Sequence, residues 1–156
     1  MSKALEVQAP NNLKLKKGYK TIFLAGSIDM GEAIEWQQKL IAAVPDEPYI
    51  WYNPRREDWD KTWKQEITNP QFKQQVEWEL KALEQADKII MYFDVKGKAP
   101  ITLLELGLHA KDNKLIVCCP KGYWKKGNVD IVCKKYNIKQ VDTLDELIKL
   151  LKNGDL

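Results

Sequence analysis

Two glutamates are predicted to lie on helix faces that are otherwise apolar, and a carboxylate in such surroundings is a candidate for chemistry. Glu105 is the single ionisable residue between Ala99 and Leu108. It follows Ile101 by four residues, so helical spacing predicts that it shares an apolar stripe with Ile101, Leu104 and Leu108. Burying a carboxylate without a partner is costly. Glu105 therefore either bonds to a neighbouring loop or reaches water, or it lines a pocket as a nucleophile or general acid or base.

Glu79 shows the same anomaly in a second segment. Residues 71–86 are predicted to form a helix, and Glu79 falls at the spacing of its apolar residues, whereas Glu77 points elsewhere. Two carboxylates in different environments can divide the roles of acid and nucleophile between them. The apolar stripe of this helix consists of Phe72, Val76, Leu80 and Leu83.

Other polar groups flank the Glu105 segment. Asp94 directly follows an apolar strand candidate, at the end where ligands meet a parallel sheet. Lys96 and Lys98 come next, and they either contact a phosphate or belong to a solvated loop, which we favour. The lone histidine, His109, lies one turn beyond Glu105 and is either a proton shuttle or, as we expect, a residue of the helix surface.

A short turn of small residues follows the first apolar run of the chain. Gly26 permits close approach of a backbone or ligand, and Ser27 and Asp29 each offer an oxygen for substrate binding. The turn lies between a predicted strand and a predicted helix, where α/β proteins place ligands. It matches neither the dinucleotide-binding fingerprint nor the P-loop.

A second candidate binding segment follows the strand predicted at residues 49–52. It is rich in Arg, Asp and Trp, which bind planar polar ligands through ion pairs, hydrogen bonds and stacking. The alternative is a surface loop that is pinned by its own Arg–Asp pairs. The candidate binding residues in this segment are Asn53, Arg55, Arg56, Asp58 and Trp59.

These residues are positioned by an alternation of strands and helices. Strands are predicted at residues 21–25, 49–52, 88–93, 114–119 and 138–141, with helices at 32–44, 71–86, from Pro100, at 128–136 and from 144. The order β-α-β-α-β-α-β-α-β predicts an α/β three-layer sandwich, flavodoxin-like or Rossmann-like, with a five-stranded parallel sheet. Residues 1–18 are expected to form a flexible arm, and residues 19–156 a single domain.

Composition limits the classes of partner. The chain has 156 residues, with 44% hydrophobic residues, 30% charged residues and a net charge of +3, which gives no indication of a nucleic-acid polymer. No apolar run approaches the ~20 residues of a membrane span. The three cysteines fit neither a disulfide framework nor a zinc site, so a reduced, cytoplasmic setting is expected. No metal or redox cofactor is indicated.

Several of these segments, in this order and spacing, resemble the nucleoside 2-deoxyribosyltransferase family, in its deoxyribosyltransferase-like branch. The resemblance covers roughly residues 20 to 130. It implies a flavodoxin-like sheet and cleavage of the N-glycosidic bond of 2′-deoxynucleosides, with transfer of the sugar to another free nucleobase. The segments that carry it are Phe23–Ile28, Asn53–Arg56, Gln75–Glu79, Ala86-Asp87 and Leu103–Gly107.

The resemblance also implies roles for particular residues. Glu105 falls on the family's nucleophile, which attacks C1′ and holds a deoxyribosyl ester, and Glu79 falls on the carboxylate that positions or protonates the departing base. A family carboxylate six residues before the nucleophile is replaced here by Ala99, with Asp94 or Asp58 as candidates to substitute for it. The family takes an Asn from a neighbouring subunit, which corresponds to Asn128 and implies a homo-oligomer.

Two other functions fit the same residues. One is a hydrolase of 2′-deoxynucleosides or their 5′-monophosphates, with Ser27 and Lys96 or Lys98 as phosphate contacts. The other is a nucleotide-binding module without turnover.

Overall fold

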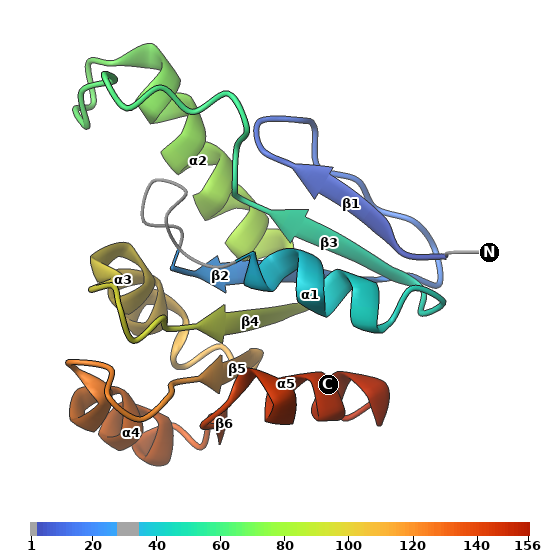
Figure 1. Ribbon diagram of the computed structural model, residues 1–156. Coiled ribbons are helices and arrows are strands. Elements are labelled where there is room, and N and C mark those ends of the chain that lie inside the picture. The colour runs from blue at the N-terminus through green and yellow to red at the C-terminus, as the bar shows by residue number, and fades with distance from the viewer. Residues whose placement is uncertain (1–2, 28–34) are drawn as a thin grey trace.

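The computed structural model describes residues 3–27 and 35–156, which form a three-layer α/β fold. Six parallel strands make one sheet in the order β1-β3-β2-β4-β5-β6, and five helices cover it (Figure 1). The strands are β1 (Leu5–Gln8), β2 (Lys20–Gly26), β3 (Tyr49–Asn53), β4 (Lys88–Tyr92), β5 (Leu115–Cys118) and β6 (Lys139–Val141). The helices are α1 (Trp36–Ala43), α2 (Pro70–Gln85), α3 (Pro100–His109), α4 (Lys126–Lys135) and α5 (Leu144–Lys152).

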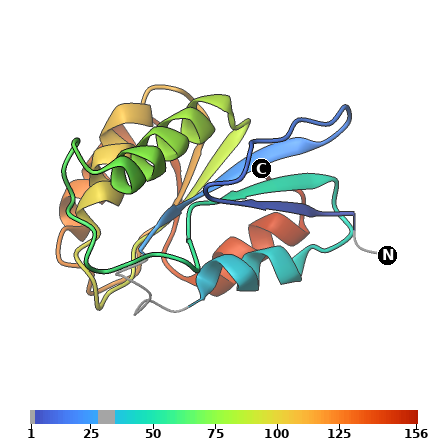
Figure 2. The same ribbon diagram turned by 90° about the horizontal axis from the view of Figure 1, so that it is seen from above.

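The helices divide between the two faces of the sheet. Helices α2, α3 and α4 pack on one face, and α1 and α5 pack on the other (Figure 2). Because side chains alternate along a strand, β2 sends Phe23 and Ala25 into the first core and Ile22 and Leu24 into the second. This two-sided burial explains why the strands read as continuous apolar runs.

Local sequence signals account for where two helices begin. Asn69 caps α2, because its side-chain oxygen accepts the backbone N–H of Phe72 at 3.0 Å, and Pro70 occupies the first helical position. Thr143 caps α5 in the same way, accepting the N–H of Glu146 at 3.1 Å. The predicted helices 71–86 and from 144 are thus confirmed to within a residue.

The sheet has six strands rather than the five predicted, and the additional strand lies inside the predicted flexible arm. The arm prediction is wrong for Leu5–Gln8, which pairs in parallel with β3 at the edge of the sheet. The Lys-rich composition of residues 1–18 suggested a solvated tail, but one buried side chain, Val7, is sufficient to anchor an edge strand of this length. The backbone carbonyls of Asn11 and Lys14 also accept side-chain hydrogen bonds from the domain.

On the other face of the sheet, the described part of the predicted 32–44 helix is α1, which begins at Trp36. Residues 32–34 of that prediction lie outside the described residues, as does Asp29. Within residues 3–27 and 35–156, no helix is long and apolar enough to cross a membrane.

Candidate functional site

The candidate site lies at the carboxyl ends of β2, β3 and β4. In the strand order β3-β2-β4, the chain leaves β2 for β3 on one side and later returns to place β4 on the other. The connections after β2 and β4 therefore diverge, which is the place where doubly wound sheets bind ligands. The predicted site residues Gly26, Ser27 and Asp94 all lie at this point.

Ser27 joins the end of β2 to the loop that follows β4. Its Oγ accepts the backbone N–H of Asp94 at 2.9 Å, and its own N–H donates to the carbonyl of Tyr92 at 3.1 Å. Ser27 is 1% exposed, and Asp94 is also buried, with Oδ1 accepting the N–H of Lys96 at 2.9 Å. Ser27 therefore sets the position of Asp94 from within the protein.

Close packing around position 26 explains why this residue is a glycine. A β-carbon at this position would lie 2.4 Å from the carbonyl oxygen of Tyr92 and 2.7 Å from Cζ2 of Trp36. The Trp36 indole is held there by a hydrogen bond of 3.1 Å from its Nε1 to the carbonyl of Ser27. Any larger residue at position 26 would have to displace a central strand or a buried indole.

Glu105 is buried, but on the opposite face of α3 from the one predicted. It is 7% exposed and shares the inward face with Thr102, Leu106 and His109. The side chains expected to be buried with it are exposed instead, and the predicted stripe is therefore wrong. These are Ile101 at 58%, Leu104 at 58% and Leu108 at 53%.

Glu79 reaches the same site from α2. Burial and, to a smaller extent, the negative charge of Glu79 together raise the pKa of Glu105 to about 8, so the Glu79 carboxylate acts on Glu105 across the site. Burial also raises the pKa of Glu79 to about 7, while a hydrogen bond from Gln75 acts in the opposite direction. The prediction that both glutamates lie in one place is consistent with this coupling.

The buried face of α2 differs from the predicted stripe. It consists of Gln75, Trp78, Ala82 and Leu83, whereas Leu80 is 42% exposed. Gln75 is the residue that the sequence reasoning missed: its Nε2 donates to the carbonyl of Pro54 at 2.9 Å and to Oε1 of Glu79 at 3.3 Å. The signal was its place four residues before Glu79 on the same helix.

His109 was also misjudged, because it is buried rather than on the helix surface. Its exposed fraction is 7%, and its Nδ1 lies 2.7 Å from Oδ2 of Asp112. It occupies the same inward face of α3 as Glu105, one turn further on. The sequence contained no signal for this, because the stripe of Ile101, Leu104 and Leu108 predicted that another face of α3 is buried.

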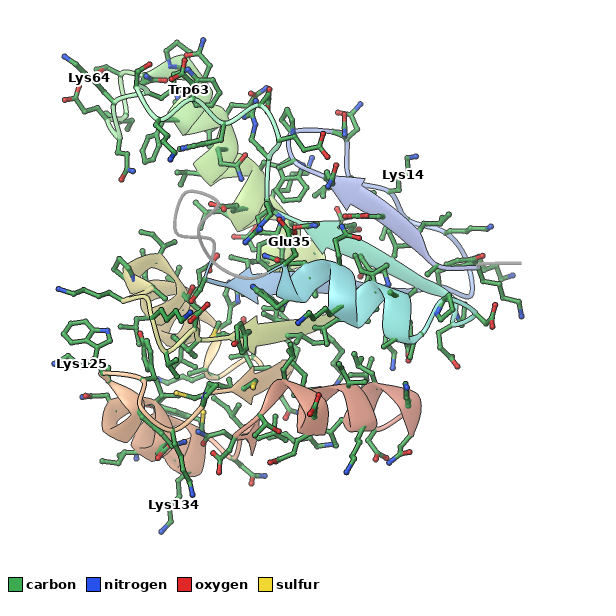
Figure 3. The ribbon with its side chains drawn as sticks, viewed as in Figure 1. Lys14, Glu35, Trp63, Lys64, Lys125 and Lys134 are labelled. Atoms are coloured by element: carbon green, nitrogen blue, oxygen red, sulfur yellow. The ribbon has the colours of Figure 1, made fainter. Side chains whose placement is uncertain are left out.

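The first part of the loop after β3 is held by internal hydrogen bonds. Asn53 donates from Nδ2 to Oε2 of Glu6 at 2.9 Å and accepts the N–H of Arg55 on Oδ1 at 3.0 Å. The guanidinium of Arg55 is paired with Glu35, which lies at the start of α1 beside this loop (Figure 3). Asn53 and Arg55 thus connect β1, β3 and α1.

The outer part of the loop makes its own cluster. Arg56 contacts Asp58 through two hydrogen bonds, of 2.9 and 3.0 Å, and stacks at 5.2 Å over the ring of Trp63. Trp59 meets Trp63 edge to face at 5.0 Å between ring centroids. Trp63 lies at the outer end of the loop, near the start of α2 (Figure 3). The Arg56–Asp58 pair matches the alternative interpretation of this segment, a surface loop that is held by its own Arg–Asp pairs.

Asn128 is exposed in the first turn of α4. This helix follows Lys125, whose side chain points away from the sheet (Figure 3). Across residues 3–27 and 35–156, no three His, Cys, Asp or Glu side chains are grouped so that they could hold a metal ion.

Two carboxylates that share one buried site can share one proton. When like charges lie close together, the pair titrates in two coupled steps, so one member is ionised while the other keeps its proton. An ionised carboxylate can act as a nucleophile, and a protonated one can act as a general acid. The arrangement is therefore suited to acid-assisted displacement at a carbon bearing a leaving group.

Comparison with known proteins gives one family and one fold. Residues 19–123 match the family model described as nucleoside 2-deoxyribosyltransferase like. A crystal structure of a conserved protein from Enterococcus faecalis V583 has the same fold, with a TM-score of 0.61 and 11% sequence identity over 87% of this chain and 99% of that one. No curated protein matches the chain.

The match spans the turn after β2, the loop after β3 and the helices that carry both glutamates. The fold agrees with the flavodoxin-like three-layer prediction, with one further strand at the edge. The chain belongs to the nucleoside 2-deoxyribosyltransferase-like family.

Proposed function

We propose that this protein transfers the 2-deoxyribosyl group of a 2′-deoxynucleoside to a second free nucleobase, with Glu105 as the nucleophile. The observation that carries the proposal is the electrostatic coupling of two glutamates, Glu105 on α3 and Glu79 on α2, at the carboxyl edge of the sheet. Family membership supports the same chemistry.

The reaction proceeds in two displacements at the same carbon. An oxygen of the Glu105 carboxylate attacks C1′, the C1′–N bond breaks, and its electron pair stays on the base, which takes a proton from Glu79. A nitrogen of the second base then attacks C1′ of the glutamyl ester. The bond to Glu105 breaks, and the proton lost by the incoming base returns to Glu79. The pair thus loses one proton in the first displacement and regains it in the second, so the complete cycle leaves its proton count unchanged.

The surroundings of Glu105 suit this role. A 2-deoxyribosyl centre develops oxocarbenium character as the base departs, and a carboxylate at C1′ stabilises that charge. Burial of Glu105 strengthens this interaction once the carboxylate is ionised, because the local dielectric constant is lower than that of water. Since burial and the charge of Glu79 raise the pKa of Glu105 to about 8, the ionised form gains population as the pH rises toward 8. The pKa of Glu79, which burial raises to about 7, suits a group that must both give and take a proton near neutral pH.

Two observations favour an unphosphorylated nucleoside over a 5′-monophosphate as the substrate. The Ser27 hydroxyl, considered above as a phosphate contact, is buried and accepts the N–H of Asp94. Position 99, at the start of α3, is an alanine, whose side chain offers no hydroxyl group to a phosphate. In this proposal Asp94 and the loop residues Asn53 to Trp59 shape the pocket, and Gly26 brings the backbone close to it.

A second copy of the chain completes the site in this proposal. Ile101, Leu104 and Leu108 expose more than half of their surface on the outer side of α3, directly behind Glu105. Apolar side chains gathered on one helix face are typical of a surface that another protein covers. A neighbouring copy docked there would contribute its Asn128 to the sugar, as the family resemblance implies.

The test is a chromatographic assay with each of the four 2′-deoxynucleosides and their 5′-monophosphates, with and without a different free base. A new deoxynucleoside that forms only with the added base supports the proposal. Release of free base without an acceptor supports a hydrolase instead, and binding without turnover supports a nucleotide-binding module. Glu105→Gln should abolish turnover, while Glu77→Gln, an exposed change on α2, should leave it unchanged.

A further inference from the structure

The Gln75 amide joins the loop after β3 to the Glu79 carboxylate. One nitrogen makes both contacts, 2.9 Å to the carbonyl of Pro54 and 3.3 Å to Oε1 of Glu79. Gln75 is 6% exposed, so water hardly competes for these hydrogen bonds. The loop side of this contact is itself held in place, since Asn53 and Arg55 on either side of Pro54 are bonded to each other.

Packing alone does not explain a glutamine at this position. Its Oε1 is buried and has no hydrogen-bond partner among the residues that the structure describes. An unsatisfied buried acceptor is costly, and an apolar side chain of the same length, such as Met, would fill the space without that cost. The benefit of Gln75 must therefore come from the two contacts that its nitrogen makes.

We propose that Gln75 is a positioning residue for the reaction proposed above: it holds the Glu79 carboxylate against the Pro54 loop and keeps it acidic enough to give its proton to the departing base. The inference rests on the proposed function. Glu105, on α3, is the charged group that interacts with Glu79 across the site, and Arg55 in the loop is paired with Glu35.

The chemical reason is that a donor N–H stabilises the ionised form of its acceptor. Burial makes Glu79 a weaker acid by raising its pKa, and the hydrogen bond from Gln75 opposes that effect. Without Gln75, Glu79 would retain its proton when the base departs. The same contact fixes the direction of the carboxylate, because the amide is itself anchored on Pro54.

The experiment compares Gln75→Met with Gln71→Met, the same change at an exposed position on the same helix. Gln75→Met should lower kcat by about 10- to 100-fold, the range expected for losing a hydrogen bond to a charged group, with KM nearly unchanged. The pH profile of kcat should move to higher pH. Gln71→Met should behave as the unchanged protein. Equal kinetics and equal pH profiles in both variants would overturn the proposal.

A double-mutant cycle separates action through Glu79 from a structural effect. In a Glu79→Gln background, adding Gln75→Met should cost no further activity, because the acid on which Gln75 acts is gone. A full additional loss would mean that Gln75 acts through the loop alone, and the proposal would fail. If Gln75→Met does not fold, Gln75→Asn keeps the amide but shortens its reach, and the same outcomes apply.

Titration of the Glu79 carboxyl group tests this inference independently of the proposed function. Carbon-13 NMR of the side-chain carboxyls gives the pKa of Glu79 without any turnover. Gln75→Met should raise that pKa even if no nucleoside is a substrate, in which case the proposed function fails and the contact stands. An unchanged pKa in a protein that does turn over nucleosides would overturn the role of Gln75 and leave the proposed function intact.

Discussion

The negative charge of Glu79 on α2 raises the pKa of Glu105 on α3, although the two residues come from helices separated by a strand in the sequence. Neither glutamate is paired with a cation in the described residues. Burial is therefore the largest influence on both pKa values, and repulsion from Glu79 adds to it at Glu105. Changing Glu79 must then change the titration of Glu105.

Replacing Glu79 by Gln should lower the pKa of Glu105, because the like charge is removed while burial remains. Turnover of deoxynucleosides should fall by about 10²- to 10⁴-fold, the usual contribution of a general acid. A p-nitrophenyl 2-deoxyriboside, whose leaving group needs no proton, should lose far less. Equal losses for both substrates, measured as kcat/KM, would remove Glu79 from the role of acid.

Replacing Glu105 by Gln should stabilise the fold at alkaline pH. Because burial raises the pKa of Glu105 from 4.5 to about 8, the folded protein binds this proton more tightly than the unfolded chain does. The stability that this provides is complete below pH 4.5 and is lost as the pH rises toward 8. Urea unfolding at pH 8 should therefore favour the variant by at least ~1 kcal/mol, with little difference at pH 5. A variant that is less stable at pH 8 would mean that the carboxylate holds the fold together.

Replacing Gly26 by Ala should destabilise the protein by about 1–3 kcal/mol, the usual cost of forcing an extra methyl group into a packed core. The added carbon would meet the Tyr92 carbonyl oxygen and the Trp36 indole. Gly107→Ala is the matched control, since a β-carbon there meets nothing within 4 Å. It should stabilise α3 by about 0.5–1 kcal/mol, and thermal melting of the two variants checks the contrast.

Replacing Leu104 by Lys should prevent the homo-oligomer that we propose from forming, without unfolding the subunit. Leu104 is 58% exposed, so its change within one copy should cost no more than about 0.5 kcal/mol. Ile131→Lys, a change of the same kind on the exposed side of α4, is the control. Light scattering after size-exclusion chromatography gives the mass of each. An unchanged protein that elutes as a monomer would contradict the expected assembly.

The sequence predicted the elements better than the faces that they bury. Apolar runs identified the strands from β2 to β5, and Asn69 and Thr143 marked two helix starts, because these signals are local. The orientation of α3, in contrast, is not determined by the sequence of the helix alone. Its most hydrophobic residues point outward and Glu105 inward, since the helix is placed by its connections and by the sheet beneath it. Glu105 is buried, which was one of the alternatives for it, but on the face of the helix opposite the predicted stripe.

The candidate site was only partly predictable for the same reason. Ser27 and Asp94 were recognised as polar residues at strand ends, but their hydrogen bond depends on β2 and β4 being neighbours. The role of Gln75 was not predicted, because its hydrogen bond to the Pro54 carbonyl joins residues 21 positions apart in the sequence.

The short strand β1 affects how an N-terminally truncated form of this protein should behave. A chain shortened to begin at Tyr19 would lose β1 and leave the whole length of β3, from Tyr49 to Asn53, as a bare edge. Unpaired N–H and C=O groups along an apolar strand are a template for joining another chain. It would also lose the Glu6 carboxylate that anchors Asn53. Such a truncated protein should be prone to aggregate during expression, whereas the full chain carries its own protecting strand.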